Sequence, residues 1–123
     1  DFRYISFEEE IMIQSYSFGR MVVDGRTYTS DLIIFPDRIK DSWWRKSGHN
    51  LCLEDVEDVF KEEFEVLVIG TGFYGLMNVE EKVKSLAQSK GVTLIIEKTK
   101  KAVQDFNEFA SKKKTIGAFH LTC

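Results

Sequence analysis

The sequence predicts an α/β domain in which an N-terminal β-hairpin precedes a central, mainly parallel sheet. Residues 18–35 are rich in β-branched and aromatic side chains, which is typical of strands. From residue 53 onward, helical patterns alternate with short apolar runs, and this β-α-β-α-β order favours parallel pairing. The chain has 123 residues, enough for one domain, residues 1–123, with one hydrophobic core.

The hairpin is expected to pair residues 18–23 with residues 26–35. Asp24-Gly25 separates the two strands, and glycine in the second position readily takes the positive φ of a tight turn. Pro36 ends the second strand, and residues 38–50 follow no clean period, so we expect a loop or an irregular strand there. Residues 1–15 form an extra N-terminal segment, to which we assign no role.

The second half is expected to alternate between helices and buried strands. Asn78 is the expected N-cap of the central helix, Gly91 ends it, and Thr99 caps the last helix. The apolar runs 66–69 and 92–96 do not alternate, so both strands should be buried on both faces. The expected elements are a helix over 54–62, a strand over 65–69, a helix over 78–91, a strand over 92–96, a helix from 99 to about 114 and a strand over 115–121.

The composition argues against several classes of partner. Seventeen basic and 20 acidic residues give a net charge of −3, which disfavours nucleic acid as a partner. The apolar runs are too short to cross a bilayer, so no membrane partner is expected. Two cysteines are too few for a disulfide framework, and we expect a cytoplasmic location.

A G-x-G-x-x-G motif covers residues 70–75 directly after an apolar strand, the pattern of a dinucleotide-binding turn. In such sites the pyrophosphate rests on a helix that begins within the motif. Here the next helix is expected to begin only at Asn78, and Glu80 and Glu81 in its first turn would repel a phosphate. We therefore expect no cofactor. A tight turn explains the glycines, and a small anion on the loop amides is favoured over a dinucleotide.

The two histidines and two cysteines form two H-x-x-C units, His49 to Cys52 and His120 to Cys123. These are zinc-ligand types. In an extended strand, however, residues i and i+3 point to opposite faces, so we expect no metal. A Cys-His nucleophile has no better support, because nothing in the sequence brings a base to either sulfur.

The segment 38–46, "RIKDSWWRK", places Trp43 and Trp44 among basic residues. Such a mixture can stack on nucleic acid, but Asp37 and Asp41 dilute its charge. A partly buried tryptophan beside an arginine stem is the more common arrangement. Because tryptophan and arginine are enriched in protein interfaces, Trp43 and Trp44 are the candidate partner contact.

In order along the chain, the motifs "YTSDLIIFP", "WWRKSGH", "VLVIGTGFYG", T-x-x-A-V-x-x-F-N and "GAFHLTC" resemble a small domain family of unknown function. Its eukaryotic relatives include an adipogenesis-associated protein and a mitochondrial assembly factor for respiratory complex I. The resemblance implies three layers with a central mixed sheet and an extra β-hairpin, and no established reaction or cofactor. The family pattern matches Asp31, Arg45, His49, Gly70, Gly72, Asn107, His120 and Cys123.

Two functions remain open for this uncharacterised protein. The first is a non-enzymatic interaction or assembly module that contacts a protein partner or a second copy. The alternative is a small-molecule or anion-binding protein, with catalysis left open, that uses the loop 70–75. Ligands on parallel sheets lie beyond the carboxyl ends of the strands, so this loop and Glu97 should share one edge. An arginine from the 38–50 loop should reach that edge. The candidate pocket residues are Arg45, His49, Gly70, Gly72 and His120.

Overall fold

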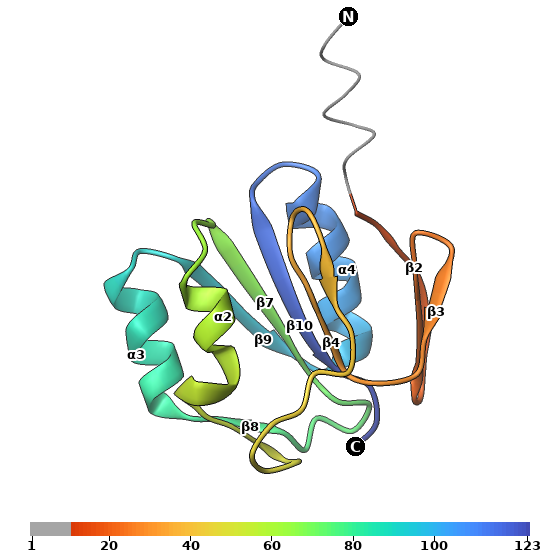
Figure 1. Ribbon diagram of the computed structural model, residues 1–123, viewed down its shortest axis with the longest axis horizontal. Helices are drawn as coiled ribbons and strands as arrows, with labels where there is room; N and C mark the ends of the chain where they lie inside the picture. Colours follow the sequence, from red (N-terminus) through yellow and green to blue (C-terminus); the bar gives the residue numbers. More distant parts are fainter. Residues whose placement is uncertain (1–10) are drawn as a thin grey trace, which may run out of the picture.

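The computed structural model describes residues 11–123, and residues 1–10 of the N-terminal segment lie outside the described part. Figure 1 shows a central sheet flanked by helices, with a smaller sheet beside it. The five strands of the central sheet are, in spatial order, β5 (Ile39–Lys40), β4 (Leu32–Ile34), β10 (Thr115–His120), β7 (Val66–Thr71) and β9 (Thr93–Glu97).

The central sheet is mixed. Strand β10 pairs in parallel with β7, and β7 pairs in parallel with β9. Strand β4 pairs in antiparallel fashion with both β10 and β5. The expected α/β class with a mixed sheet is therefore confirmed. Among the described strands of the central sheet, two pairings are parallel and two are antiparallel, so a mainly parallel sheet is not confirmed.

The N-terminal hairpin forms around the expected turn, where Asp24 and Gly25 have φ values of 49° and 81°. It belongs to a separate antiparallel sheet of β1 (Ile13–Ser17), β2 (Arg20–Val23) and β3 (Arg26–Tyr28). The expectation of one continuous strand over 26–35 is wrong. Tyr28 pairs with Met21 in the small sheet, whereas Leu32 pairs with Phe119 in the central sheet. The polar residues 29–31 carry the chain from one sheet to the other.

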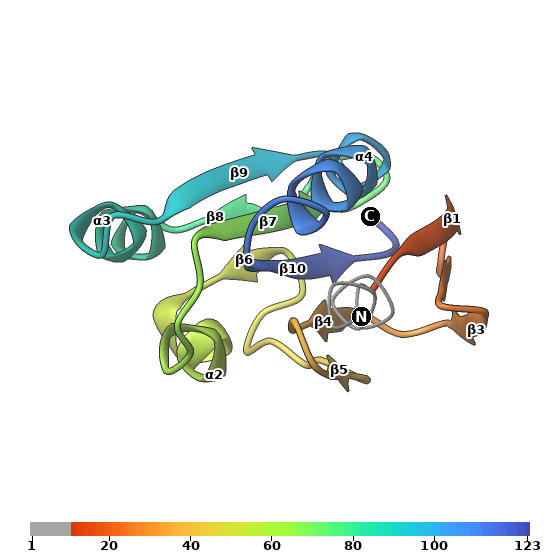
Figure 2. The same cartoon turned by 90° about the horizontal axis from the view of Figure 1, so that it is seen from above.

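The two faces of β7 are buried against different elements, as the alternation of a strand requires. Val66 and Val68 pack with α4 and the small sheet, whereas Leu67 and Ile69 pack with α2 and α3. Seen from above, α2 and α3 lie on one side of the sheet, and α4 and β1 lie on the other (Figure 2). The helical elements are η1 (Leu53–Val56), α2 (Glu57–Phe60), α3 (Glu81–Ser89) and α4 (Thr99–Ala110).

Strand β9 is only partly buried, which corrects the expectation of burial on both faces. It pairs with β7 on one side and forms the edge of the sheet. Its apolar centre is half-buried, and Thr93 and Glu97 at its ends are exposed. A non-alternating apolar run thus occurs here on an edge strand.

The start of α3 also differs from the expectation. Asn78 is not its N-cap, because Asn78–Val79 form β8, which pairs in parallel with β6 (Asn50–Leu51). The amide of Glu80 donates to the carbonyl of Leu51, so the helix begins only at Glu81. At its other end, Gly91 has a φ of 69° directly after the C-cap, as the sequence predicts.

Candidate functional site

Three polar side chains from separate parts of the chain meet at the end of β10. Asp31 precedes β4, Arg45 lies in the loop between β5 and β6, and His120 is the last residue of β10. Because β4 runs antiparallel to β10, the start of β4 lies beside the end of β10. Asp31 Oδ2 accepts hydrogen bonds from Arg45 Nη2 and His120 Nδ1, each at 2.7 Å. Asp31 is therefore the centre of the cluster.

Backbone contacts fix this carboxylate and the loop beside it. Asp31 Oδ1 accepts the amide hydrogen of Leu121 at 2.7 Å, and the Asp31 carbonyl accepts that of Trp43 at 2.8 Å. Arg45 Nη2 also lies 3.1 Å from the carbonyl of Gly48, to which it donates. The guanidinium carbon lies 4.8 Å from the centroid of the Trp43 ring, within the range of a cation–π contact.

The cluster is largely shielded from solvent. The exposed fraction of the side chain is 4% for Arg45, 6% for His120 and 16% for Asp31. Burial alone would raise the pKa of Asp31. The hydrogen bonds from His120, Leu121 and Arg45 outweigh this effect and lower the pKa, so Asp31 is ionised near neutral pH.

The ionised carboxylate determines where the proton of His120 lies. A 2.7 Å contact between Nδ1 and a carboxylate oxygen that is already an acceptor requires a hydrogen on Nδ1. Arg45 Nη2 lies 3.1 Å from the same Nδ1, so these two donors converge on one acceptor and do not bond to each other. In the neutral imidazole, Nε2 is then the nitrogen with a free lone pair.

Three nitrogens of this cluster have no hydrogen-bond partner among the described residues. They are Nε and Nη1 of Arg45 and Nε2 of His120, and all three are buried. Leaving a buried polar group unpaired costs about 1–3 kcal/mol, so such groups call for an explanation. Within the described residues, Arg45 therefore has two N–H groups without an acceptor, and they lie in the same cluster as the unpaired Nε2 of His120.

A cavity of about 310 Å³ lies over the cluster. Asp31, Arg45 and His120 are among its lining residues, and Trp43 and Trp44 contribute aromatic surface. Its hydroxyl-bearing lining residues are Thr29, Ser30, Ser42 and Thr122. A ligand here would meet donors, acceptors and an apolar wall.

The structure brings together some of the predicted pocket residues and separates others. Arg45 and His120 lie side by side, within the reach expected from the parallel strands. His49 is exposed, with its ring centroid 6.0 Å from that of His120. Gly70 and Gly72 are not among the residues that line the cavity. Glu97 pairs with Gly70, as expected for neighbouring parallel strands.

The amides of the glycine loop donate within the chain. The Gly72 amide donates to Thr99 Oγ1 at 2.9 Å. Those of Phe73 and Gly75 donate to the carbonyls of Thr122 and Gly72, and the amide of Leu76, directly after the loop, donates to the carbonyl of Cys123. These backbone donors, which the sequence offered as an anion site, are occupied by the chain itself.

Close packing explains the glycines. A Cβ on Gly70 would lie 2.8 Å from Thr99 Oγ1. Gly72 has a φ of 107°, and a Cβ there would lie 2.4 Å from the backbone carbonyl carbon of Cys123. Only glycine permits both this backbone conformation and this approach.

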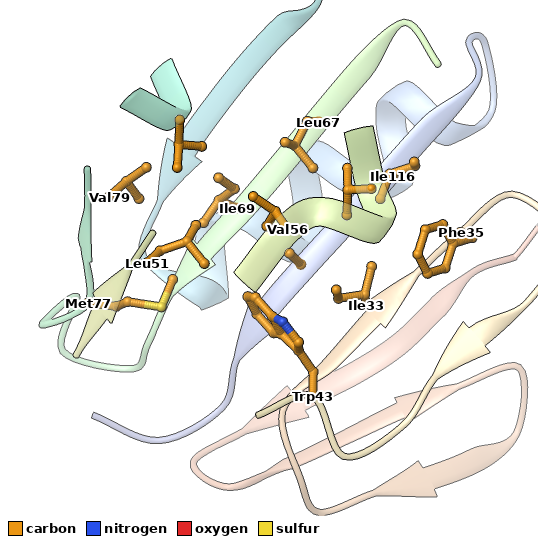
Figure 3. Packing of buried hydrophobic residues seen from close by; sticks show 13 residues of the cluster. Ile33, Phe35, Trp43, Leu51, Val56, Leu67, Ile69, Met77, Val79 and Ile116 are labelled. Atoms are coloured by element: carbon orange, nitrogen blue, oxygen red, sulfur yellow. The ribbon is translucent and has the colours of Figure 1, made fainter. Parts of the chain in front are cut away.

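The two tryptophans have opposite environments. Trp43 is 2% exposed and packs into the core beside Val56 and Leu51 (Figure 3). Its Nε1 donates to the carbonyl of Asp55 at 2.9 Å. Trp43 is therefore no exposed partner contact, which corrects that expectation. Trp44 is 82% exposed, and its role as a partner contact stays a prediction.

The two H-x-x-C units do not converge. Within residues 11–123, no three His, Cys, Asp or Glu side chains are grouped so that they could hold a metal ion. Cys52 and Cys123 are free, and Cys52 Sγ donates to Asp55 Oδ2 at 3.3 Å. The expectation that the protein needs no metal stays a prediction.

Sequence reasoning underrated two residues of the site. Asp31 matches the family pattern but is not among the candidate pocket residues, although an acid directly before an apolar strand is a visible signal in the sequence. Thr99 was expected to cap α4, yet the N-cap is Lys98. The Thr99 hydroxyl donates to the His120 carbonyl at 2.6 Å and accepts from Gly72, which joins the glycine loop to the end of β10.

An exposed aromatic cluster, also missed from the sequence, lies beside the glycine loop. It consists of Phe18, Phe73 and Tyr74, all exposed. The ring centroids of Phe18 and Phe73 are 5.7 Å apart, and those of Phe73 and Tyr74 are 5.1 Å apart. These rings come from the β1–β2 turn and from residues 70–75.

Comparison with known proteins assigns the chain to a family. It matches the family described as a protein of unknown function, DUF498/DUF598, over residues 13–121. The chain belongs to this family. It is therefore an uncharacterised protein of a family without an assigned function.

Solved structures show the same fold. A conserved hypothetical protein from Pyrococcus horikoshii OT3 is 30% identical, with 90% of this chain and 98% of that chain covered and a TM-score of 0.77. A Bartonella henselae protein described as an outer membrane protein is 24% identical, with 90% of this chain and 94% of that chain covered and a TM-score of 0.76. A Bordetella pertussis protein described as an Mth938-like domain is 16% identical, with 92% of this chain and 87% of that chain covered and a TM-score of 0.69. The last two show the fold alone.

Over the described residues, every helix is too short or too polar to cross a membrane. The cytoplasmic location expected from the cysteine content stays a prediction.

Proposed function

We propose that this domain binds a small molecule with an oxygen acceptor in the cavity beside Arg45. One observation carries the proposal: the Arg45 side chain is almost fully buried, yet its Nε and Nη1 have no partner among the described residues. Buried polar groups in folded proteins nearly always have a partner. A ligand oxygen would supply one.

The chemistry of the cavity supports an oxyanion or a carbonyl compound. Guanidinium groups form strong hydrogen bonds with carboxylate and phosphate oxygens. The volume of about 310 Å³ is at the small end of known ligand pockets, which begin at about 300 Å³. The hydroxyl-bearing lining residues offer further polar contacts, and Trp44 offers an aromatic surface. Because the amides of the glycine loop are used within the chain, this cavity replaces that loop as the proposed site.

Ligand binding can be tested by NMR titration of the ¹⁵N-labelled protein with benzoate and sulfate. With benzoate and sulfate we expect saturable chemical-shift changes in the amides of Asp31, Arg45 and His120. Benzamide, an uncharged amide, should not cause larger changes than benzoate. Arg45→Gln should abolish saturation. Arg38→Gln is the matched control, because Arg38 is an exposed arginine paired with Asp37 and Glu62. Equal binding by the two variants would contradict the proposal.

A second candidate function is a protein-interaction module, supported by the exposed cluster of Phe18, Phe73 and Tyr74. Aromatic residues are enriched in the cores of protein interfaces. The resemblance to a family with a mitochondrial assembly factor among its eukaryotic relatives also supports this role. This role requires no reaction.

Self-association is the first test of this module. Sedimentation velocity at increasing concentration should show a dimer for the wild type if a second copy covers the cluster. Phe73→Ser should then return the protein to a monomer, whereas Met12→Ser, which removes an exposed apolar side chain outside the cluster, should not. A dimer that persists in Phe73→Ser would place the interface elsewhere.

A further inference from the structure

We infer that an oxyanion enters the Arg45 cavity together with one proton, which His120 takes up at Nε2. The inference rests on the proposed function and narrows it, because it names a charged ligand and the group that compensates its charge. It concerns protonation only and involves no reaction of the ligand.

The charges of the buried cluster carry the argument. Without a ligand, ionised Asp31 balances Arg45, so an imidazole of His120 that carries a hydrogen on Nδ1 alone leaves the cluster without net charge. An anion added to this neutral group would leave one uncompensated negative charge in a site shielded from water, which is strongly disfavoured. One proton on His120 restores the balance, with two negative and two positive charges.

The geometry determines where that proton goes. His120 Nδ1 already carries a hydrogen that it donates to Asp31, so Nε2 is the imidazole atom left to accept a proton. Nε2 is buried without a partner. Its lone pair would repel an anionic oxygen nearby, whereas a protonated Nε2 becomes a donor.

The groups around His120 do not offer another site for the proton. Asp31 accepts three hydrogen bonds and is held in its ionised form. The guanidinium of Arg45 has only donors and no atom that can accept a proton. Tyr16 donates its hydroxyl hydrogen to the Leu121 carbonyl, and its pKa is raised to about 12, so it stays neutral.

His49 is a further titratable group near His120, with ring centroids 6.0 Å apart. It is exposed, so water can stabilise either of its protonation states without a ligand. His120 is buried and lines the cavity.

The experiment is calorimetric titration with benzoate, which stays ionised between about pH 6 and 8. The titrations are repeated in buffers with different ionisation enthalpies, which gives the number of protons taken up. We expect binding to be roughly tenfold weaker at pH 8 than at pH 6, with uptake approaching one proton per benzoate at pH 8. Imidazole ¹⁵N shifts at pH 8 should show Nε2 of His120 unprotonated in the free protein and protonated in the complex.

Two variants assign the proton. His120→Asn keeps a donor for Asp31 but cannot take up a proton, so its residual binding should be independent of pH. His49→Asn is the matched control and should keep the wild-type pH dependence. The ¹⁵N measurement uses the wild type, so it decides the question even if His120→Asn does not fold.

The possible failures are distinguishable. Binding of equal strength at both pH values, without proton uptake, would overturn this inference and leave the proposed function standing. A pH dependence that persists in His120→Asn and is lost in His49→Asn would also overturn the inference and leave the proposed function standing. If neither benzoate nor sulfate binds saturably at any pH, the proposed function fails and the inference fails with it.

Discussion

Asp31 and His120, which lie 89 residues apart in the sequence, are joined by a hydrogen bond of 2.7 Å between Oδ2 and Nδ1. This bond connects the start of β4 to the end of β10, and Arg45 from a third segment donates to the same oxygen. The carboxylate thus joins three segments of chain at the place where the unpartnered buried side-chain nitrogens of the described residues lie.

Asp31→Asn should destabilise the protein by about 3–5 kcal/mol, because it leaves the buried guanidinium of Arg45 without its counter-charge. The measurement is the free energy of unfolding from urea titration at pH 7. Asp37→Asn is the control: this exposed acid pairs with Arg38 at the surface and should change stability by no more than about 1 kcal/mol.

The stability difference between the wild type and Asp31→Asn should depend on pH in a definite direction. The pKa of Asp31 is lowered in the folded protein, so its contribution is complete above the ordinary value of 3.8 and is lost as the pH falls through the folded pKa. The wild type and Asp31→Asn should therefore become more similar in stability below about pH 4. A difference that stays constant through this range would show that the charge of Asp31 does not stabilise the cluster.

Tyr16 should make the fold sensitive to alkaline pH. Burial, followed by the charge of Asp31, raises the pKa of Tyr16 from 10.0 to about 12. The neutral phenol is thus favoured by folding, so its contribution is present below pH 10.0 and is lost as the pH rises from 10.0 to about 12.

The test is urea unfolding at several pH values from about 9 to 11.5. Tyr16→Phe loses the hydrogen bond to the Leu121 carbonyl, which should cost about 1 kcal/mol at neutral pH. Its stability should fall less steeply with pH than that of the wild type. Tyr74→Phe, at an exposed tyrosine, should retain the wild-type slope. Parallel slopes for all three proteins would contradict the prediction.

Gly72→Ala should be one of the most destabilising single-methyl substitutions in the chain. The residue has a φ of 107°, and its new Cβ would lie 2.4 Å from the carbonyl carbon of Cys123. Strain and overpacking each cost about 1–3 kcal/mol, so we expect a loss of at least about 2 kcal/mol.

Gly48→Ala is the matched control for this substitution, because a Cβ on Gly48 meets no atom within 4 Å. Its unfolding free energy should change by no more than about 0.5 kcal/mol. If Gly72→Ala proves equally harmless, the glycine is not needed for the close approach of residues 122–123.

Local sequence rules predicted the features that depend on neighbouring residues. Asp24-Gly25 formed its turn, and the parallel crossover rule placed Glu97 beside Gly70. The break between β3 and β4 could not be predicted in this way. It depends on Asp31 meeting residues 120 and 121, at the other end of the chain.

Two further differences arise from the same cause. Asn78 has the chemistry of an N-cap, but pairing with Asn50 of β6, 28 residues earlier, makes it part of a strand. Trp43 and Trp44 are chemically identical neighbours, and only the packing of α2 and the sheet decides which of them is buried. Contacts between distant segments settled each of these features, and a single sequence does not display them.

The last prediction is that neither NADH nor FAD binds. The strands do provide the setting of a dinucleotide site, since β7 and β9 are parallel and Glu97 lies beside Gly70. A pyrophosphate also needs free amides and a helix N-terminus next to the glycine loop. Here the amides of Gly72 and Phe73 donate within the chain, and α3 begins only at Glu81 with an acid in its first turn.

Fluorescence titration of each cofactor with the protein measures this directly. We expect no saturable change at micromolar protein, and the same flat response from the wild type and from Glu81→Gln, which removes the acid at the helix start. Saturable binding of either cofactor to the wild type would mean that the loop opens and releases the carbonyls of Thr122 and Cys123. Binding that appears only in Glu81→Gln would instead show that the amides are accessible and that the carboxylate alone excludes the phosphate.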